Sequence, residues 1–407
     1  YYAKSAPREV TKEELKVIVK QFGEAALRFK KAGGDGVEIQ AAHAHGLLGG
    51  FLTPLYNKRT DEYGGDIHGR LRLTLEVIEE VRKQCGRDFI IDVRISGDEY
   101  SDGGLTLNDM IYVSKQLEKA TVDFIHVSGG NTIKRGSSMP ASGTAPAPHM
   151  HASEEIKKHV SIPVATVSRI NEPWVADELI ANGKTDICMI GRPNLCDSEF
   201  ANKAKAGKID EIRPCIGCGR CLTGIMFGKP ISCTVNPAVE KEEIDEAPVK
   251  KKVLVVGGGP AGMEAAYVAK KRGHEVVLCE QSDRLGGQLN IACVPIGKQE
   301  ITKVVKYMKS QLTGVDVRLN TTVTKEMIEN EFKDLENLNN IIEEKIPNAK
   351  WNIDTVLINE MILEKQGLKK ENIIDSGICS VCNSDLIHSY RVEKKGYGLN
   401  TALISLN

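Results

Sequence analysis

Residues 89–127 read FIIDVRISGDEYSDGGLTLNDMIYVSKQLEKATVDFIHV, and this stretch decides the fold class. The apolar run Phe89–Ile95 predicts a buried strand, and Val122–Val127 predicts a second one. Between them, Thr106 has the side chain of a helix N-cap, and apolar residues follow at helical spacing over Leu107–Lys119. Because buried strands that alternate with helices pair in parallel, the sequence predicts an α/β fold on a parallel sheet.

The same unit recurs on both sides of the quoted stretch. Its further helix and strand patterns cover residues 11–31, 36–40, 71–84, 153–159, 163–167, 173–182 and 186–190. Polar residues stand at or just beyond the strand ends, which form the rim that carries the chemistry of a (β/α)8 barrel. The pattern holds only five strands, too few to close such a barrel. We therefore expect an incomplete (β/α)8 TIM barrel over residues 1–210, with an ordinary doubly wound domain as the alternative.

A cysteine cluster follows the barrel pattern, within residues 211–240. It has the spacing Cys215-x2-Cys218-x2-Cys221, with a fourth member at Cys233. Four thiolates suit either zinc or an iron–sulfur cluster. Three closely spaced cysteines with a distant fourth are typical of iron–sulfur ligation, so we expect a [4Fe–4S] cluster rather than zinc.

A glycine-rich turn marks a second α/β domain over residues 250–324. The turn reads Gly257-x-Gly259-x-x-Gly262, follows an apolar strand at 253–256 and opens a helix through residue 271. Glu280 ends the next predicted strand. In this arrangement the glycines let a pyrophosphate approach the helix N-terminus, and the acidic residue binds ribose hydroxyls. The sequence predicts a partial Rossmann-like domain that binds FAD or NAD(P).

The composition excludes some classes of protein. The chain has 54 Lys and Arg against 55 Asp and Glu, so its charge does not favour nucleic acid or an anionic membrane. No apolar run is long enough to span a bilayer, and the first residues lack a secretory signal pattern. Eleven cysteines at partly metal-like spacing favour a reducing compartment. We expect a cytoplasmic location.

Three stretches of the barrel region carry a family resemblance. They are residues 36–72, with FLTPLYNKRTDEYGG at 51–65, residues 93–96, and residues 190–193. These stretches resemble the Old Yellow Enzyme group of FMN reductases. The resemblance implies that Arg94 lies at the pyrimidine edge of FMN. It also implies that Arg169 and Arg192, with the backbone near Ser168 and Gly191, hold the FMN phosphate.

The same resemblance implies that the first strand here corresponds to the family's fourth. The barrel would then consist of the last five βα units, and the chain would be truncated at its start. At the family's substrate-anchoring motif this chain has Gln40, His43 and His45. We expect Gln40 and His43 to hydrogen-bond a substrate carbonyl and His45 to supply the final proton, although a lone His is more often structural. His149 and His151 are weaker acid candidates.

The cysteine segment resembles one branch of that group more closely. Residues 213–218 (RPCIGC) and 232–237 (SCTVNP) match the branch that includes 2,4-dienoyl-CoA reductase, 2-enoate reductase and trimethylamine dehydrogenase. The resemblance implies a cluster that relays electrons between FMN and FAD. The stretch LGGQ, ending at Gln288, is similar to the branch's flavoprotein portion and favours FAD as the bound nucleotide.

The C-terminal residues have a different character. Residues 376–391 (SGICSVCNSDLIHSYR) resemble the end of the laccase-domain, or purine nucleoside phosphorylase, family. We expect residues 340–407 to be a fragment of that kind, joined to a reductase in a fused or misassembled reading frame. Cys379 and Cys382 would then be structural, with a zinc half-site or a redox pair as alternatives.

These inferences together predict an NAD(P)H-dependent reductase of activated alkenes. Electrons would pass from NAD(P)H through FAD and the cluster to FMN, and then to an unsaturated carbonyl or acyl thioester. An amine dehydrogenase of the same family is one alternative. Another is an inactive or merely cluster-binding electron-transfer fragment. A homo-oligomer is compatible with the sequence, and the sequence does not identify the substrate.

Overall fold

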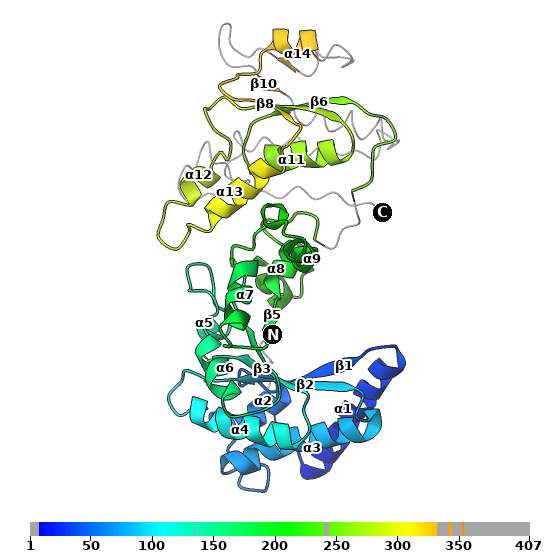
Figure 1. Ribbon diagram of the computed structural model, residues 1–407, viewed down its shortest axis with the longest axis vertical. Helices are drawn as coiled ribbons and strands as arrows, with labels where there is room; N and C mark the ends of the chain where they lie inside the picture. The colour runs from blue at the N-terminus through cyan, green and yellow to red at the C-terminus, as the bar shows by residue number, and fades with distance from the viewer. Residues whose placement is uncertain (1–7, 134, 240–243, 332–341, 344–351, 354–407) are drawn as a thin grey trace. The chain divides into compact units, whose positions relative to one another are not determined.

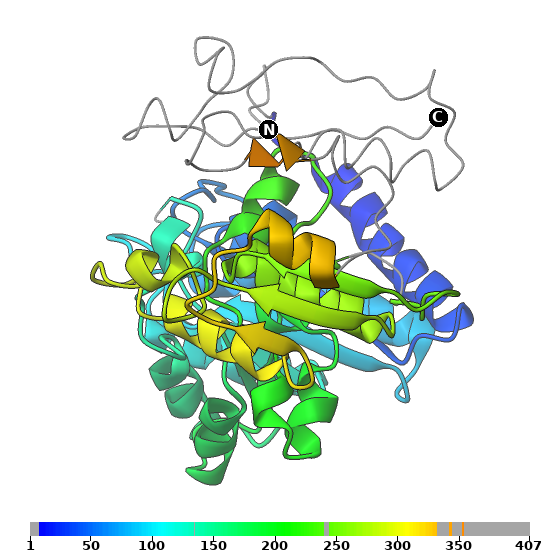
Figure 2. The ribbon, with the colours of Figure 1, turned by 90° about the horizontal axis from the view of Figure 1, so that it is seen from above.

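The computed structural model describes residues 8–133, 135–239, 244–331, 342–343 and 352–353. The chain divides into two units, residues 1–322 and 323–407, and each is described by itself. The first unit holds two parallel sheets (Figures 1 and 2).

The first sheet has five parallel strands in the order β1-β2-β3-β4-β5. The strands are β1 (Gly36–Gln40), β2 (Ile90–Ser96), β3 (Phe124–Ser128), β4 (Val164–Val167) and β5 (Ile187–Met189). Each strand lies next to the one that precedes it in the chain, as successive βα units of a barrel do. The predicted α/β class, the parallel pairing and the strand order are confirmed.

Helices connect the strands and cover the sheet. Those of the barrel region are α1 (Lys12–Lys31), α2 (Gly46–Leu52), α3 (Ile67–Cys85), α4 (Leu107–Lys119), α5 (Arg135–Ser138), α6 (Met150–Lys157) and α7 (Pro173–Ala181). Both predicted N-caps are present, because Thr11 caps α1 and Thr106 caps α4, each in a reciprocal capping box. Helices α1, α3 and α4 lie on the same side of β1–β3 in Figure 1.

The core of the barrel region lies between the sheet and these helices. Leu71 and Ile78 of α3, Ile91 and Ile95 of β2, and Met110 of α4 are all 0% exposed. Alternate residues of β2 therefore face the helices, and the residues between them face the opposite side of the sheet. That opposite side holds Asp92, Arg94 and Ser96, which are the polar members of the strand.

Short helices lead from the barrel region to the cysteine segment. They are α8 (Arg192–Cys196), α9 (Phe200–Lys205), η1 (Ile209–Glu211) and α10 (Arg220–Met226). Arg213 fastens this segment, because its guanidinium donates to both carboxylate oxygens of Glu264 at 2.9 Å and to the Val235 carbonyl at 2.7 Å. The guanidinium also lies 5.1 Å from the centre of the Tyr307 ring.

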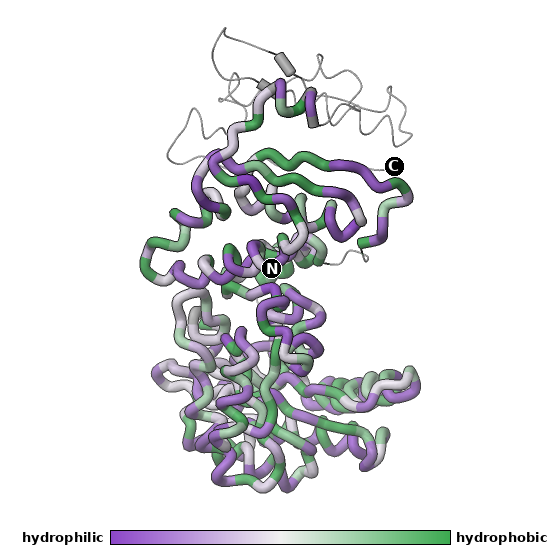
Figure 3. The backbone as a smooth tube through the Cα atoms, turned by 45° about the horizontal axis from the view of Figure 1, so that its top comes forward, coloured by the Kyte–Doolittle hydropathy of each residue, from purple (hydrophilic) through white to green (hydrophobic). Residues whose placement is uncertain are grey.

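The second sheet has three parallel strands in the order β6-β7-β8. Its elements are β6 (Lys252–Val256), α11 (Pro260–Lys271), β7 (Glu275–Cys279), α12 (Leu289–Ala292), α13 (Ile301–Ser310) and β8 (Asp316–Arg318). Figure 3 shows hydrophobic colour along most of β6 and β7. Four of the five β7 residues are buried, whereas β6 is half-buried in its middle and exposed at both ends. The predicted strand–glycine turn–helix–strand unit is confirmed.

The second unit is described only in part, as α14 (Lys325–Glu331) and an antiparallel pair, β9 (Ile342–Glu343) with β10 (Asn352–Ile353). The laccase-domain-like segment and its Cys379 and Cys382 lie outside the described residues. Among the helices that are described, none combines the length and the apolar character needed to cross a membrane.

Candidate functional site

Polar side chains gather on the face of the first sheet that the connecting helices leave uncovered. Strand register places Gln40 opposite Arg94, and Arg94 opposite His126. One residue pair nearer the strand starts, Glu38 lies opposite Asp92. Because side chains alternate along a strand, all of these groups point to the same face.

Arg94 is the central cation of this face. Its guanidinium donates one long bond, from Nη2 to Ser128 Oγ at 3.4 Å. Its Nε atom is buried and has no hydrogen-bond partner within the described residues. Burial lowers the pKa of Arg94, while the nearby carboxylates of Glu38 and Asp92 act in the opposite direction. A buried donor without a partner is rare, and it fits a position reserved for a ligand acceptor.

Three residues that the sequence analysis missed surround Arg94: Glu38, Asp92 and His126. One potential ligand atom from each lies within 4.8 Å of those of the other two. Burial, and next the Glu38 carboxylate, raise the pKa of Asp92 to about 8, so Asp92 is protonated at neutral pH. Burial likewise lowers the pKa of His126. With Glu38 ionised and Arg94 charged, the group is close to electrically neutral, and the Glu38 carboxylate stabilises the charge of Arg94. Alternation along β1, β2 and β3 was the available sequence signal.

His43 lies at the end of β1 in a strained conformation, with φ 66°. Its backbone N–H donates to Ser96 Oγ at 2.8 Å, and its Nδ1 lies 3.3 Å from the Gly130 carbonyl oxygen. Burial, and then the charge of Arg94, lower the pKa of His43 to about 4, so the ring is neutral at pH 7. Because a carbonyl only accepts, Nδ1 carries the proton in this arrangement, and Nε2 is an acceptor. The predicted donor role of His43 would need the other tautomer.

Gln40 and His45 are both exposed. The Oε1 atom of Gln40 accepts from the Ala42 backbone N–H at 3.2 Å, which leaves its amide NH2 group available as a donor. His45 is the N-cap residue of α2, but its side chain does not cap the helix. The structure therefore brings Gln40 into line with Arg94, whereas no described contact connects His45 with either.

The two weaker acid candidates flank Tyr100, which the sequence analysis did not consider. The Tyr100 hydroxyl lies 3.2 Å from His149 Nδ1, and the two rings stack with centroids 5.8 Å apart. The His151 ring is 6.2 Å from that of Tyr100. Burial lowers the pKa of His149 to about 4, and burial raises the pKa of Tyr100 to about 12. His149 thus has a packing role, in agreement with its weak standing as an acid.

The four residues predicted to hold a phosphate lie at the ends of β4 and β5. Ser168 and Arg169 both have positive φ, 86° and 55°. Arg192 donates from Nη1 to the Pro140 carbonyl at 2.9 Å, and a Cβ atom added to Gly191 would have no atom within 4 Å. The Arg169 guanidinium is engaged differently, because it is ion-paired with Glu300. Gly191 and Arg192 therefore retain open space around them, and the Arg169 side chain does not.

The four motif cysteines lie in a loop and at the start of α10. Cys221 is buried, Cys215 and Cys233 are half-buried, and Cys218 is exposed. Gly217 and Gly219 adopt positive φ of 63° and 75°, which lets the loop turn sharply between the thiols. No three cysteine sulfurs of the described residues lie within 4.8 Å of one another, as the ligands of a single zinc ion would. A fifth thiol, Cys196, hydrogen-bonds to Cys233 and is 1% exposed.

The glycine turn of the second sheet has two kinds of glycine. A Cβ atom added to Gly262 would lie 1.9 Å from the Gly257 carbonyl oxygen, and Gly257 itself has φ 103°. Gly259 has an ordinary φ of −72°, and a Cβ added there would meet nothing within 4 Å. Backbone conformation therefore requires glycine at 257 and packing requires it at 262, but neither explains Gly259. Open space at Gly259 is what close approach of a pyrophosphate requires.

Glu280 and Gln288 border the same turn. Glu280 accepts from the Gly258 N–H at 2.6 Å and from the Ser282 N–H at 2.8 Å. The hydrogen bonds from Ser282 hold the pKa of Glu280 below its ordinary value. The Ser282 hydroxyl also donates to Oε1, at 2.6 Å, whereas Oε2 accepts from Gly258 and keeps a lone pair for a ribose hydroxyl. Gln288 is exposed at the start of α12.

Comparison with known proteins identifies the chain. The NADH:flavin oxidoreductase / NADH oxidase family matches residues 2–211, and the FAD dependent oxidoreductase family matches residues 252–370. The NADH oxidase of Thermoanaerobacter brockii is 43% identical over 330 residues, which is 79% of this chain and 50% of that protein. The chain belongs to the NADH:flavin oxidoreductase / NADH oxidase family.

Other relatives of this chain differ in what their names say they act on. The cinnamate reductase of Clostridium sporogenes is 38% identical and covers 79% of this chain and 51% of its own length. The N,N-dimethylglycine/sarcosine dehydrogenase of Chromohalobacter salexigens is 34% identical, covering 78% of this chain and 48% of its own length. A 2-naphthoyl-CoA reductase structure superimposes with a TM-score of 0.75 at 32% identity, over 80% of this chain and 50% of that one. The chain thus spans about half the length of the curated relatives it matches.

The match to the FAD dependent oxidoreductase family also bears on the predicted domain boundary. It extends to residue 370, whereas the sequence analysis ended the flavoprotein portion near residue 324. The boundary itself lies where the structure describes only short segments, so the predicted domain limits stay predictions.

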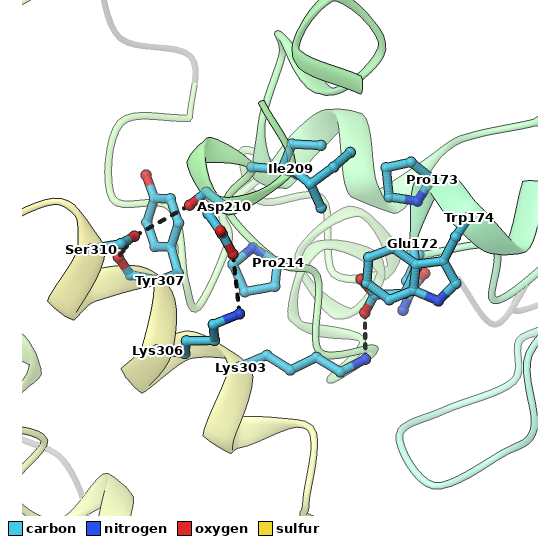
Figure 4. A pocket seen from close by; sticks show the side chains of 12 residues that line it. Glu172, Pro173, Trp174, Ile209, Asp210, Pro214, Lys303, Lys306, Tyr307 and Ser310 are labelled. Carbon is cyan, nitrogen blue, oxygen red and sulfur yellow. Dashed lines mark hydrogen bonds and ion pairs between the residues drawn. The ribbon is translucent and has the colours of Figure 1, made fainter. Parts of the chain in front are cut away.

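A cavity of about 170 Å³ lies beside α13. Figure 4 shows Lys303 reaching Glu172, and Lys306 reaching Asp210, across this cavity. Trp174 and Tyr307 supply aromatic surface to its lining. Because both lysines already face carboxylates, the cavity offers no free cation to an anionic ligand.

Proposed function

We propose that this chain is the flavin- and cluster-binding part of a reductase of activated C=C bonds, supplied with electrons by NAD(P)H. The observation that supports it most directly is Arg94, a half-buried cation beside Gln40 and His43 whose buried Nε has no partner among the described residues. This group can bind the pyrimidine edge of FMN, which carries hydrogen-bond acceptors and gains negative charge on reduction. FMN, when bound, supplies the hydride that the substrate's β-carbon accepts.

The chain's own residues would orient and polarise the substrate. Gln40 has a free amide NH2 because its Oε1 is already bonded to Ala42, and that NH2 can donate to a substrate carbonyl. His43, on the tautomer fixed by Gly130, accepts through Nε2 and so selects a donor group on the ligand. We retain His45 as the proton source, because it is exposed and has no described partner to hold it elsewhere.

The phosphate of FMN would lie at the ends of β4 and β5. The backbone of Ser168, Arg169 and Gly191 and the guanidinium of Arg192 are the groups we assign to it. Open space beside Gly191 supports this assignment, since a phosphate needs close approach to backbone N–H groups.

The four cysteines would hold a [4Fe–4S] cluster that passes single electrons. Among the described residues no three of these sulfurs lie within 4.8 Å of one another, and the Gly217 backbone N–H donates to the Cys215 sulfur. A cluster of this kind supplies a one-electron relay between two-electron carriers. Because free thiolates persist in a reducing compartment, we expect the chain to act in the cytoplasm.

The second sheet would hold FAD. Gly259 leaves room for the pyrophosphate, the start of α11 offers backbone N–H groups, and Glu280 retains a lone pair for ribose. We assign Gly257, Gly259, Gly262, Glu280 and Gln288 to this nucleotide.

The test is anaerobic reconstitution of the chain with iron, sulfide, FMN and FAD, followed by cofactor analysis. We expect about four irons per chain together with both flavins. The reconstituted chain, reduced with dithionite, should then reduce cinnamate. Zinc in place of iron would overturn the cluster, and iron without FMN would favour an electron-transfer fragment.

An amine dehydrogenase is the second candidate, because one relative of 34% identity is named for dimethylglycine and sarcosine. Oxidised reconstituted chain mixed with dimethylglycine tests it through bleaching of the flavin absorbance. We expect no bleaching, since the face around Arg94 is close to electrically neutral and offers no surplus negative charge to an amine cation. Bleaching by the amine would replace the reductase proposal.

A further inference from the structure

Arg169 differs from the other arginines of the strand ends in how completely it is bonded. It is 5% exposed, and its guanidinium meets both carboxylate oxygens of Glu300, with Nη1 donating to Oε2 at 3.1 Å. Nε and Nη2 also donate to the Thr144 carbonyl, at 3.3 and 3.0 Å. Such a two-pronged Arg–carboxylate pair fixes geometry as well as charge.

The guanidinium also lies against the cysteine loop. A Cβ atom added to Gly217, which lies between Cys215 and Cys218, would be 2.1 Å from Arg169 Nη1. The loop is held at two further points, because Ser142 N–H donates to the Gly217 carbonyl and Asn171 Nδ2 donates to the Cys215 carbonyl, each at 3.0 Å. The position of the loop is therefore tied to the strand end that carries Arg169.

Glu300 brings in the nucleotide-binding domain. It is the residue before α13, and its carboxylate also accepts from Ser142 Oγ at 3.2 Å. The same hydroxyl lies 3.0 Å from the Gly297 carbonyl. One buried ion pair thus joins β4, the cysteine loop and the segment that leads into α13.

We propose that the Arg169–Glu300 pair is a positioning device that holds the cysteine loop at the strand ends of the barrel region. Arg169 is then a phosphate contact through its backbone alone. The inference rests on the proposed function in one respect: the loop would carry the electron relay. Removing one charge leaves the other buried without a partner, so the loop should loosen.

The structure supplies a matched control. The pair Lys303–Glu172 also joins α13 to the segment after β4, but the Lys303 side chain is 43% exposed (Figure 4). Glu172→Gln therefore removes an ion pair between nearly the same elements at little cost. Glu300→Gln removes the buried one.

The first test needs no cofactor: hydrogen–deuterium exchange of the full chain over residues 214–219. We expect Glu300→Gln to speed exchange there by about tenfold, and Glu172→Gln to change it by less than about twofold. Equal exchange in Glu300→Gln and wild type would overturn the device. If Glu300→Gln does not fold, the double variant Arg169→Gln/Glu300→Gln leaves no unpaired charge and allows the same comparison.

The second test uses reconstituted chain. Rapid reduction by a photochemical donor should show that Glu300→Gln slows electron exchange between cluster and flavin by about tenfold or more, with iron and FMN content unchanged. Arg169→Gln should also keep its FMN. Loss of FMN from Arg169→Gln alone would make the guanidinium a phosphate ligand and overturn the proposal. If wild type takes up neither iron nor flavin, the proposed function fails while the exchange test of the pair still stands.

Discussion

Along one edge of the five-stranded sheet, the ends of β1–β3 and the ends of β4–β5 hold their arginines in opposite ways. Arg94 is half-buried, with a buried and unpartnered Nε and a single long bond to Ser128. Arg169 is more deeply buried, and its guanidinium is bonded to Glu300 and Thr144. Both residues follow the same local pattern of a polar side chain at the end of a buried strand.

The difference separates polar groups that are hydrogen-bonded within the protein from polar groups that remain available to a ligand. An unpartnered buried donor costs the fold free energy, about 1–3 kcal/mol, unless a ligand supplies the partner. The half of the edge around Arg94 has this cost, together with a strained His43. The half around Arg169 also has positive-φ residues, Ser168 and Arg169, but there the guanidinium is bonded to protein groups and so contributes to assembly.

The largest expected effect concerns the thiols, where a motif cysteine available to a metal contrasts with a cysteine packed in the core. Cys233→Ser should lower bound iron to below about a tenth of wild type after reconstitution, because a metal site lacking one of its ligands binds far more weakly. Cys196→Ser should keep its iron, since Cys196 is 1% exposed, packs in the second core and lies outside the motif. Iron and sulfide analysis measures both. Iron loss from Cys196→Ser alone would reassign the ligands.

Arg94→Gln directly tests the half of the sheet edge around Arg94, whose groups remain available to a ligand. We expect FMN affinity to fall by about 100-fold, because the variant loses charge-assisted bonds to the flavin. Fluorescence titration of FMN measures this, with circular dichroism to confirm folding. Arg169→Gln is the control, and its affinity should stay within about fivefold. The reverse order of the two variants would invert the comparison drawn between the two halves.

Sequence patterns predicted the fold well because its strands are short apolar runs and helices α1 and α4 begin with capping boxes. The predicted helix over Leu107–Lys119 and the strand at 36–40 agree with the structure to the residue. The elements that the sequence patterns did not predict are held in place by tertiary contacts. Helix α13 and strand β8 were not predicted, and α13 owes its place to buried Val304 and Tyr307, which pack against the second sheet.

The site was predictable only where a single residue type, repeated at a local spacing, indicates one kind of chemistry. Cysteine spacing and the glycine turn marked their loops, whereas Glu38, Asp92 and His126 lie on three strands and meet only through register. Glu300 was invisible for the same reason, since it lies 131 residues from Arg169 in sequence. No local pattern encodes such a pair.

The two glycines of the second sheet allow a smaller and cleaner test. Gly259→Ala should leave the unfolding temperature unchanged, because an added Cβ meets nothing, yet weaken FAD binding by about tenfold. Gly262→Ala should instead destabilise the chain by about 1–3 kcal/mol, because its Cβ meets the Gly257 carbonyl. Calorimetry and FAD titration separate the two. Unimpaired FAD binding by Gly259→Ala would show that the open space is not a nucleotide site.

The smallest expected effect is on the free energy of unfolding at acidic pH, and it comes from two histidines on the Arg94 side of the sheet edge. Burial holds the pKa of His43 and of His149 at about 4 in the folded chain, against about 6.5 when unfolded. Between these values the unfolded chain binds more protons, so this contribution is complete above pH 6.5 and is lost as pH falls toward 4. From pH 7 to pH 5 we expect a loss of about 1–3 kcal/mol from the two residues together. The variant His43→Asn/His149→Asn should show a flatter dependence in urea unfolding, and because both proteins share all other titrating groups, equal slopes would show that neither histidine is held neutral by the fold.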